Sequence, residues 1–157
     1  MAQFQLDNID RIILASLTSN ARKPYLEIAR ECGISGAAIH QRVHKLEENG
    51  VITGSRLMVK PQALGLGVCV FINITLSETG KYREVIDRLR KIPEVVECHF
   101  VTGKYSLLVK VFCQNNEELI KVIIKDFQTI PYIESTDTVI VLDTAFERPL
   151  PVKGNSK

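Results

Sequence analysis

Residues that could contact nucleic acid are concentrated in the segment 35–48. Its first part contains small side chains, an amide, imidazoles and a cation, and its two acids, Glu47 and Glu48, come only at the end. Amide, imidazole and ammonium groups can bind base edges and phosphates, and small residues allow a helix N-terminus to approach a groove closely. The residues with these properties are Ser35, Gly36, Ala37, His40, Gln41, His44 and Lys45.

Three further cations, Lys23, Arg42 and Arg56, could contact phosphates. Arg42 lies about 60° from the apolar side of the helix expected here, so it could instead pair with an acid of the first helix. Arg56 belongs to a strand-like segment, residues 51–60, that could form a wing, a hinge strand or both. Isolated cations on a strand are commonly only solvated, so both interpretations of Arg42 and of Arg56 stay open.

The sequence contains no pattern typical of an enzyme or a metal site. No nucleophile–base pair or phosphate-binding loop is visible. His99 directly follows Cys98, and neighbouring residues of a strand point to opposite faces. The four cysteines are far apart and form no CxxC pair, which is typical of reduced thiols in a cytosolic protein. We therefore expect neither catalysis nor a metal or other cofactor.

Three helices are predicted to position the segment 35–48. Asp7 is a suitable N-cap for the first helix, and Pro24 suits the first turn of the second. Gly33 supplies a tight turn, and Ser35 caps the third helix, residues 36–48. Two helices joined by a short turn with Gly are the helix-turn-helix pattern. The third helix has an apolar face opposite the candidate DNA contacts, formed by Ile39, Val43 and Leu46.

The segment 60–67, with one Pro and two Gly, divides the chain. Residues 1–60 contain eight Lys and Arg against six Asp and Glu, whereas residues 61–157 contain twelve of each, so the net charge of +2 resides in the first part. Only local charge matters to a nucleic acid. We expect a DNA-binding domain at 1–60, a linker at 61–66, a second domain at 67–147 and a frayed tail at 148–157.

The second part alternates strand-like and helical segments in the order β-α-β-β-α-β, which is typical of a ferredoxin-like fold. Its second helix should be capped by Asn115, with a capping-box partner in Glu118. That helix is expected to turn four apolar residues inward: Leu119, Ile120, Ile123 and Phe127. The expected strands are 68–76, 95–101, 105–113 and 133–142, and the first helix is 82–92.

The helices of such a fold cover only one face of the sheet. The apolar runs 68–72 and 107–112 show little alternation, which indicates strands buried on both faces. Depending on register, the second face would carry Phe71, Val109 and Val111 or their neighbours. We expect a second copy of the chain to cover it in a two-fold dimer.

In order and spacing, these features resemble the Lrp/AsnC family of bacterial and archaeal transcription regulators over about residues 4–144. The similarity is carried by LDNIDRIIL at 6–14, NARK at 20–23, GIS at 33–35, IHQRV at 39–43, LEENGVI at 46–52 and TGKYS at 102–106. The stretches 7–10, 102–106 and 128–130 are most similar to the AsnC branch.

The resemblance implies an α+β protein, with an N-terminal winged helix-turn-helix and a C-terminal ferredoxin-like βαββαβ ligand-sensing domain. It also implies binding to double-stranded promoter DNA, control of amino-acid metabolism, homodimers that assemble into octamers, and a cytoplasmic, nucleoid-associated location. Asparagine is the first candidate effector. The residues implied to bind it are Phe100, Val101, Thr102, Gly103, Lys104, Tyr105, Ile133, Glu134, Ser135, Thr136 and Asp137.

The chemistry of these residues suits a zwitterion. The glycine turn exposes backbone N–H groups and Lys104 adds a cation for a carboxylate, while Asp137 or Glu134 could accept from an ammonium. The same residues could instead form only an exposed strand end and a hairpin turn. The family's turn commonly reads Gly-Asp-Tyr-Asp, and here Lys104 and Ser106 replace both acids. Other small amino acids therefore stay open as effectors.

Two other functions fit the sequence less well: an RNA-binding module and the regulatory subunit of an enzyme. Residues 103–109 weakly resemble the strand motif of RNA-recognition domains, but the preceding cation is missing and Tyr105 is their only aromatic. A regulatory subunit would leave residues 1–60 unexplained. The longest apolar run has five residues, so no membrane span is expected, and the N-terminus does not resemble a secretory signal.

Overall fold

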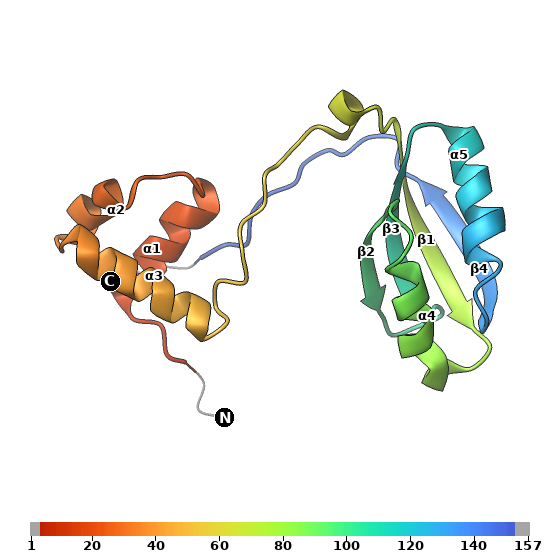
Figure 1. Ribbon diagram of the computed structural model, residues 1–157, viewed down its shortest axis with the longest axis horizontal. Coiled ribbons are helices and arrows are strands. Elements are labelled where there is room, and N and C mark those ends of the chain that lie inside the picture. Colours follow the sequence, from red (N-terminus) through yellow and green to blue (C-terminus); the bar gives the residue numbers. More distant parts are fainter. Residues whose placement is uncertain (1–3, 153–157) are drawn as a thin grey trace. The chain divides into compact units, whose positions relative to one another are not determined.

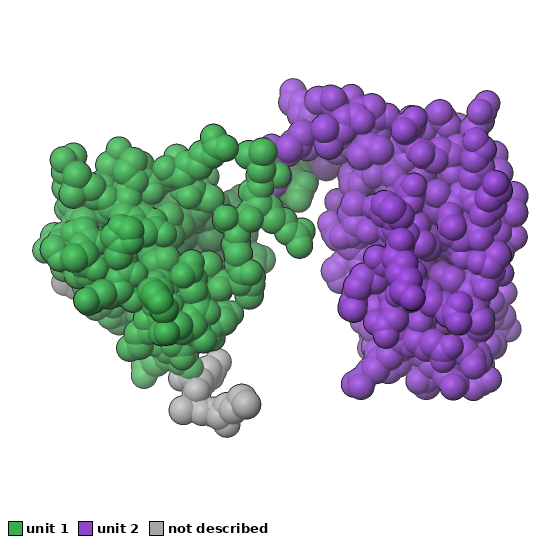
Figure 2. Space-filling model, in the orientation of Figure 1, with its two compact units in different colours: residues 1–57, 146–157 green, residues 58–145 purple. Residues whose placement is uncertain are grey.

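The computed structural model describes residues 4–152 (Figure 1). They form two compact units, shown in different colours in Figure 2. The first unit contains the described residues up to Leu57 together with those from Phe146 onward, and the second is Met58–Ala145. Across the described part of the chain, no helix is both long and apolar enough to cross a bilayer.

The first unit has the three predicted helices: α1 (Asn8–Ser19), α2 (Tyr25–Cys32) and α3 (Gly36–Glu48). Asp7 caps α1 in a reciprocal capping box with Asp10. The hydroxyl of Ser35 accepts from the Ala38 N–H at 3.2 Å and caps α3, as predicted. One residue from each helix is fully buried at the centre of the unit: Ile13, Ile28 and Ile39.

Gly33 makes the sharp turn between α2 and α3. Its φ is +67°, in the left-handed region that glycine adopts without a steric penalty. The Ile34 N–H then donates to the carbonyl of Ala29, which closes the end of α2. The predicted helix-turn-helix is therefore confirmed.

The strand expected at 51–60 is not formed. Residues 52–60 are irregular and all but Ile52 are exposed. A strand needs a hydrogen-bonded neighbour, and the strand pairing in the described chain joins only four strands of the second unit. The expectation of a frayed tail at 148–157 is wrong in part, because Val152 packs against the core of the first unit. Residues 153–157 of that tail lie outside the described residues.

The second unit confirms the predicted β-α-β-β-α-β order. Its strands are β1 (Val68–Leu76), β2 (Val95–Phe100), β3 (Leu107–Cys113) and β4 (Ile133–Ile140), in the antiparallel order β2-β3-β1-β4. Its helices are α4 (Tyr82–Leu89) and α5 (Asn116–Lys121), which continues as the π-helix η3 (Val122–Phe127). Two short 3-10 helices, η1 (Pro61–Leu64) and η2 (Thr79–Lys81), precede β1 and α4.

Both helices pack on one face of this sheet, where alternate residues of β1 and β3 are buried. Val109 and Val111 lie on this covered face, so of the two alternatives that depended on register, the structure has their neighbours on the open face. In the register, Phe71 of β1 pairs with Lys110 of β3. The residues of both strands that alternate with the buried ones therefore lie on the open face, as predicted for Phe71. The open face carries Cys69, Phe71, Asn73, Leu108, Lys110 and Phe112.

The π-helix corrects the expected inner face of the second helix. Asn115 caps α5 as predicted, but Ile120 is 55% exposed and Val122 is buried instead. In η3 the Gln128 N–H donates to the carbonyl of Ile123, five residues back. This wider turn places residues five apart on one side, so Val122 and Phe127 both reach the core.

Candidate DNA- and effector-binding surfaces

The third helix divides into a buried and an exposed edge, as its sequence predicts. Ile39, Val43 and Leu46 are at most 5% exposed. The opposite edge is open to solvent and consists of Ala37, His40, Gln41, His44 and Lys45. This edge has no acid until Glu47 and Glu48, so an approaching polyanion meets donors and a cation first.

Several side chains of the exposed edge have neighbours. The ring of His40 meets that of Tyr25 edge-on, with centroids 4.6 Å apart. The Nζ of Lys45 lies 5.4 Å from the ring centroid of Phe4. The Nδ1 of His44 is 3.4 Å from Oε1 of Glu48. These contacts orient the edge without covering it.

A shallow hollow of about 500 Å³ lies on this edge, where the start of α2 meets α3. Its lining includes Tyr25 from α2 and the candidate DNA contacts His40, Gln41 and His44 from α3. Tyr25 was not singled out from the sequence. The signal that could have found it is an aromatic residue directly after Pro24, at the first position of α2.

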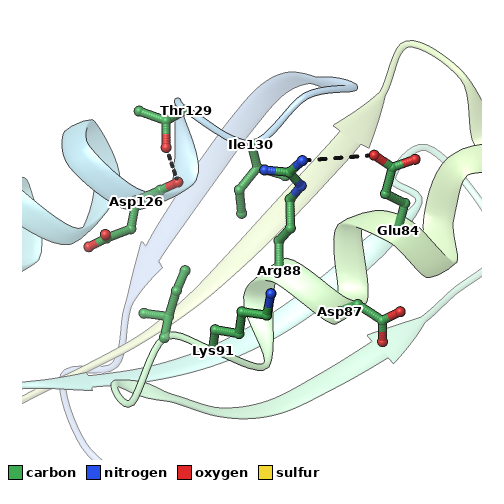
Figure 3. A pocket seen from close by; sticks show the side chains of 8 residues that line it. Glu84, Asp87, Arg88, Lys91, Asp126, Thr129 and Ile130 are labelled. Atoms are coloured by element: carbon green, nitrogen blue, oxygen red, sulfur yellow. Dashed lines mark hydrogen bonds and ion pairs between the residues drawn. The ribbon is translucent and has the colours of Figure 1, made fainter.

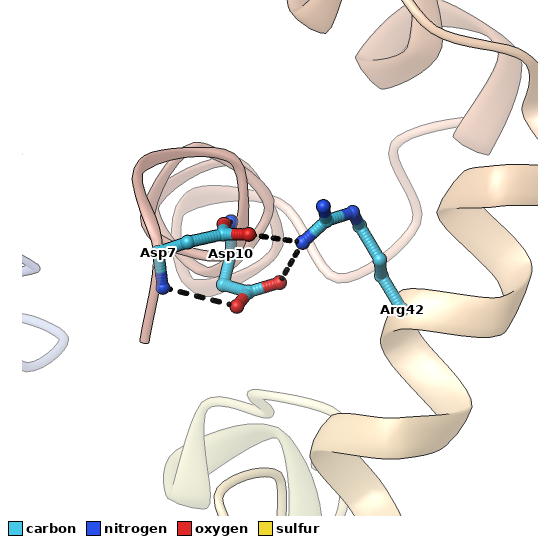
Figure 4. A network of polar contacts seen from close by, with 3 residues as sticks. All are labelled: Asp7, Asp10 and Arg42. Carbon is cyan, nitrogen blue, oxygen red and sulfur yellow. Dashed lines mark hydrogen bonds and ion pairs between the residues drawn. The ribbon is translucent and has the colours of Figure 1, made fainter. Parts of the chain in front are cut away.

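Arg42 makes the structural contact that the sequence left as an alternative (Figure 4). Its Nη1 donates to Oδ2 of Asp7 at 2.6 Å and to Oδ1 of Asp10 at 2.8 Å. Although partial burial opposes ionisation, the backbone N–H of Asp10 and the Arg42 guanidinium hold the pKa of Asp7 below its usual value. Arg42 thus ties α3 to the capped start of α1.

Lys23 and Arg56, the other two cations predicted to contact phosphates, differ in their surroundings. The Nζ of Lys23 pairs with Glu31 and also contacts the hydroxyl of Ser16. Arg56 is exposed on the irregular segment that follows α3. Lys23 therefore links α2 to the end of α1, whereas Arg56 extends into solvent.

The two segments implied to hold an effector come together at one end of the sheet. The Tyr105 hydroxyl donates to Oδ2 of Asp137 at 2.8 Å and joins the glycine turn to β4. Ile74 of β1 pairs with Leu107 on one side and with Thr136 on the other, so both segments border the same strand. Gly103 has φ +111°, which only glycine adopts readily.

Aromatic rings and cations surround this end. Phe100 is 51% exposed and stacks on Tyr82 with ring centroids 4.4 Å apart. The Nζ of Lys104 lies 5.1 Å from the Tyr105 centroid. Of the other ten predicted residues, six are exposed and four are half-buried: Thr102, Gly103, Lys104, Glu134, Ser135 and Asp137, then Val101, Tyr105, Ile133 and Thr136. The sequence did not predict Tyr82 at this end, because it is the first residue of α4 and belongs to neither 100–105 nor 133–137.

A separate hollow of about 540 Å³ lies between α4 and the end of η3 (Figure 3). Its lining combines two buried isoleucines, Ile92 and Ile130, with charged residues, of which Arg88 lies 3.9 Å from Glu84. Its lining is Glu84, Asp87, Arg88, Lys91, Ile92, Asp126, Thr129 and Ile130. None of the predicted effector residues is among them.

The cysteines and His99 form no reactive arrangement. Cys98 packs toward the helix-covered core, while His99 lies 3.5 Å from Glu97 on the other face, as the alternation predicts. All four cysteines are free thiols. Burial raises the pKa of Cys113 to about 11, so its thiol is protonated at neutral pH. Within residues 4–152, no group of three or more His, Cys, Asp or Glu could hold a metal ion.

Both units match known protein families. Residues 6–53 match the family described as "Winged helix-turn-helix DNA-binding", and residues 69–151 match "Lrp/AsnC ligand binding domain". The chain is 41% identical to Regulatory protein AsnC of Escherichia coli K12 over 150 residues, which cover 96% of this chain and 99% of that protein. It is 39% identical to an HTH-type transcriptional regulator of Pyrococcus horikoshii over 149 residues, covering 94% and 97%.

Solved structures agree with these similarities. The structure of E. coli AsnC superposes with a TM-score of 0.87 and covers 94% of this chain and 99% of that one. A feast or famine regulatory protein from M. tuberculosis, complexed with L-methionine, is 28% identical and has a TM-score of 0.88 over 95% and 100% of the chains. The chain therefore belongs to the Lrp/AsnC family and is a DNA-binding transcription regulator with a C-terminal ligand-binding domain.

Proposed function

We propose that this regulator inserts α3 into the major groove of double-stranded promoter DNA under the control of a small amino acid bound by the second unit. The observation that carries the proposal is the exposed edge of α3, which has no acid before Glu47 and lies opposite the buried apolar edge. A helix needs such an edge because every acid facing the groove would repel phosphates. The chain would act in the cytoplasm on the nucleoid, without catalytic activity.

The contacts divide by chemistry. His40, Gln41 and Lys45 would contact base edges, and Ser35, Gly36 and Ala37 would let the start of α3 approach the backbone. His44, Lys23 and Arg56 would contact phosphates. The pairing of Arg42 with Asp7 and Asp10 favours orientation of α3 as its main role.

A DNA-binding assay tests this assignment. Full-length protein should shift a double-stranded promoter fragment in preference to single-stranded RNA of equal length. Replacing Gln41 and Lys45 together by Ala should lower affinity for the duplex about 10-fold or more, because base-edge contacts contribute about 1–3 kcal/mol each. Lys121→Ala, at an exposed lysine of α5, is the control for loss of one charge. Unchanged affinity of the double variant would contradict the contact assignment.

The effector would bind at the end of the sheet formed by the glycine turn and β4. Backbone N–H groups around Gly103 and the Lys104 ammonium would hold the carboxylate, and Asp137, whose Oδ2 already accepts from Tyr105, would receive the ammonium through its other oxygen. Asparagine is the first candidate. Its binding would change DNA affinity by about 5- to 150-fold, the range of a coupling of about 1–3 kcal/mol.

A thermal-shift panel of amino acids, with particle size measured for each hit, tests the effector site. A ligand that binds only the folded state raises the melting temperature. Asp137→Asn should abolish the shift for asparagine, whereas Asp143→Asn, at an exposed aspartate beyond β4, should preserve it. An equal shift in both variants would exclude Asp137 as the ammonium partner.

Assembly would supply the second copy of α3. The open sheet face presents Phe71, Leu108 and Phe112 around Lys110, whose Nζ lies 5.8 and 5.6 Å from the two phenylalanine rings. Covering this face with a second copy would bury those rings in a two-fold dimer. Two α3 helices about 34 Å apart would match successive major-groove faces. Octamers would raise the effective concentration of DNA-binding units, offsetting a net charge of only +2 per chain.

A further inference from the structure

The ring of Tyr25 connects an exposed DNA-facing side chain to the core of the first unit. Tyr25 is the first residue of α2, and it is half-buried and packed against that core. The His40 ring rests edge-on against it, with centroids 4.6 Å apart and planes inclined by 68°. His40 itself is exposed on α3. The contact therefore anchors a solvent-facing imidazole to a fixed part of the fold.

Such anchoring matters because a base contact requires a fixed direction. A freely rotating exposed side chain must be ordered when DNA binds, and this ordering weakens binding by about 2- to 10-fold per side chain. An edge-to-face aromatic contact orders the imidazole in advance. A ring N–H held in one direction fits the N7 acceptor that purines present in the major groove.

We propose that Tyr25 is a positioning residue for DNA recognition, holding the imidazole of His40 toward one purine of the binding site. The inference rests on the proposed function of α3. The hollow supports it, because Tyr25 and His40 line it together with the other candidate contacts Gln41 and His44; Glu47 and Glu48 complete its lining at the end of α3. The Tyr25 hydroxyl makes no hydrogen bond within residues 4–152, so the aromatic ring alone would position the imidazole of His40.

The experiment compares sequence preferences of full-length variants. Selection from a randomised duplex library first defines the sites that the wild-type protein binds. His40→Ala should lose the preference for a purine at one position, with discrimination falling about 5- to 150-fold. Tyr25→Ala should lose about 2- to 10-fold of the discrimination at that same position. Tyr25→Phe, which keeps the ring, should behave as wild type.

Additivity separates positioning from a general structural role. In a variant with both Tyr25→Ala and His40→Ala, discrimination should equal that of His40→Ala alone, because Tyr25 acts only through His40. Tyr25→Leu repeats the test with apolar packing retained, and melting temperatures verify folding. Leu26→Ala, at the adjacent residue that is 59% exposed, is the matched control.

Three results would overturn the inference. The first is a uniform loss of affinity for all duplexes in Tyr25→Leu, which would make Tyr25 merely structural. The second is an effect that adds fully to that of His40→Ala. The third is a wild-type protein with no duplex preference, which would overturn the proposed function as well and is thereby distinguished from the other two.

Discussion

Arg42 shows how one residue can orient α3 from a position beside its proposed DNA contacts. Its guanidinium bridges the N-cap Asp7 and the side chain of Asp10, which is only 8% exposed. Because Asp7 and Asp10 lie at the start of α1 and Arg42 lies on α3, the bridge links these two helices. The nearly buried Asp10 carboxylate depends on this partner for its charge balance.

Arg42→Gln should therefore destabilise the first unit. Losing one partner leaves the Asp10 carboxylate without its cation, and we expect a loss of about 1–3 kcal/mol in the free energy of unfolding. Urea denaturation of the full chain measures it. Arg30→Gln, at an exposed arginine of α2, should change stability by less than about 0.5 kcal/mol. Equal effects of the two substitutions would contradict the structural role of Arg42.

The same cluster predicts a pH dependence of stability. The folded pKa of Asp7 is lowered, so its contribution is fully present above the unfolded value of about 4 and is lost as the pH falls through the folded pKa. The melting temperature of the wild-type chain should fall as the pH decreases from 5 to 3. Asp7→Asn should show a shallower fall, since it removes the titrating group; an identical slope would refute this assignment.

At the scale of elements, two turns decide where the candidate binding residues lie. The turn at Gly33 sets α3 against α2, and the turn at Gly103 brings Tyr105 to Asp137. Both glycines have positive φ, and no atom lies within 4 Å of where a Cβ would be. The need for glycine at these positions is thus a backbone requirement and not a matter of space.

Gly33→Ala should lower stability by about 1–2 kcal/mol, the cost of holding an L-residue in the left-handed region. Gly36→Ala is the matched control, because it lies in α3 with ordinary φ and its new Cβ would meet only Leu26 at 4.0 Å. Thermal unfolding of both variants by circular dichroism measures the difference. A Gly36→Ala protein that melts as low as Gly33→Ala would contradict this explanation.

At the scale of the whole molecule, the chain leaves each unit incomplete in a different way. The first unit is not built from the N-terminal residues alone, because Val152 packs into its core from the far end of the sequence. The second unit leaves one sheet face without cover from its own helices. The return of the chain means that residues beyond Phe146 contribute to the stability of the DNA-binding unit.

Leu108→Asp should disrupt the proposed dimer. The substitution places a charge on the open sheet face, and burying an unpaired carboxylate there would cost more than association returns. Light scattering should show a fall in particle mass towards that of one 17.6 kDa chain. Leu57→Asp, at a residue 73% exposed in the first unit, should keep the wild-type mass. An unchanged mass for Leu108→Asp would place the interface elsewhere.

Local patterns in the sequence determined most of the fold. The three N-terminal helices, the Ser35 cap, the two edges of α3 and the β-α-β-β-α-β order all follow from caps, glycines and periodicities that act over a few residues. The resemblance to the Lrp/AsnC family, and not a local pattern, implied that the glycine turn and the opening of β4 belong to one site. Those two segments are joined by the hydrogen bond between Tyr105 and Asp137.

Contacts between distant residues were decided only by the tertiary structure. The strand at 51–60 failed because no neighbour pairs with it. Val122 and Phe127 both reach the core because the π-helix η3 changes the residues per turn after Lys121, whereas Ile120 of α5 is exposed. Packing between helices brings Arg42 to Asp7 and Asp10, and it brings the ring of Tyr25 to that of His40. Residue type and spacing specify what a side chain can do, but its partner depends on which elements the whole fold brings together.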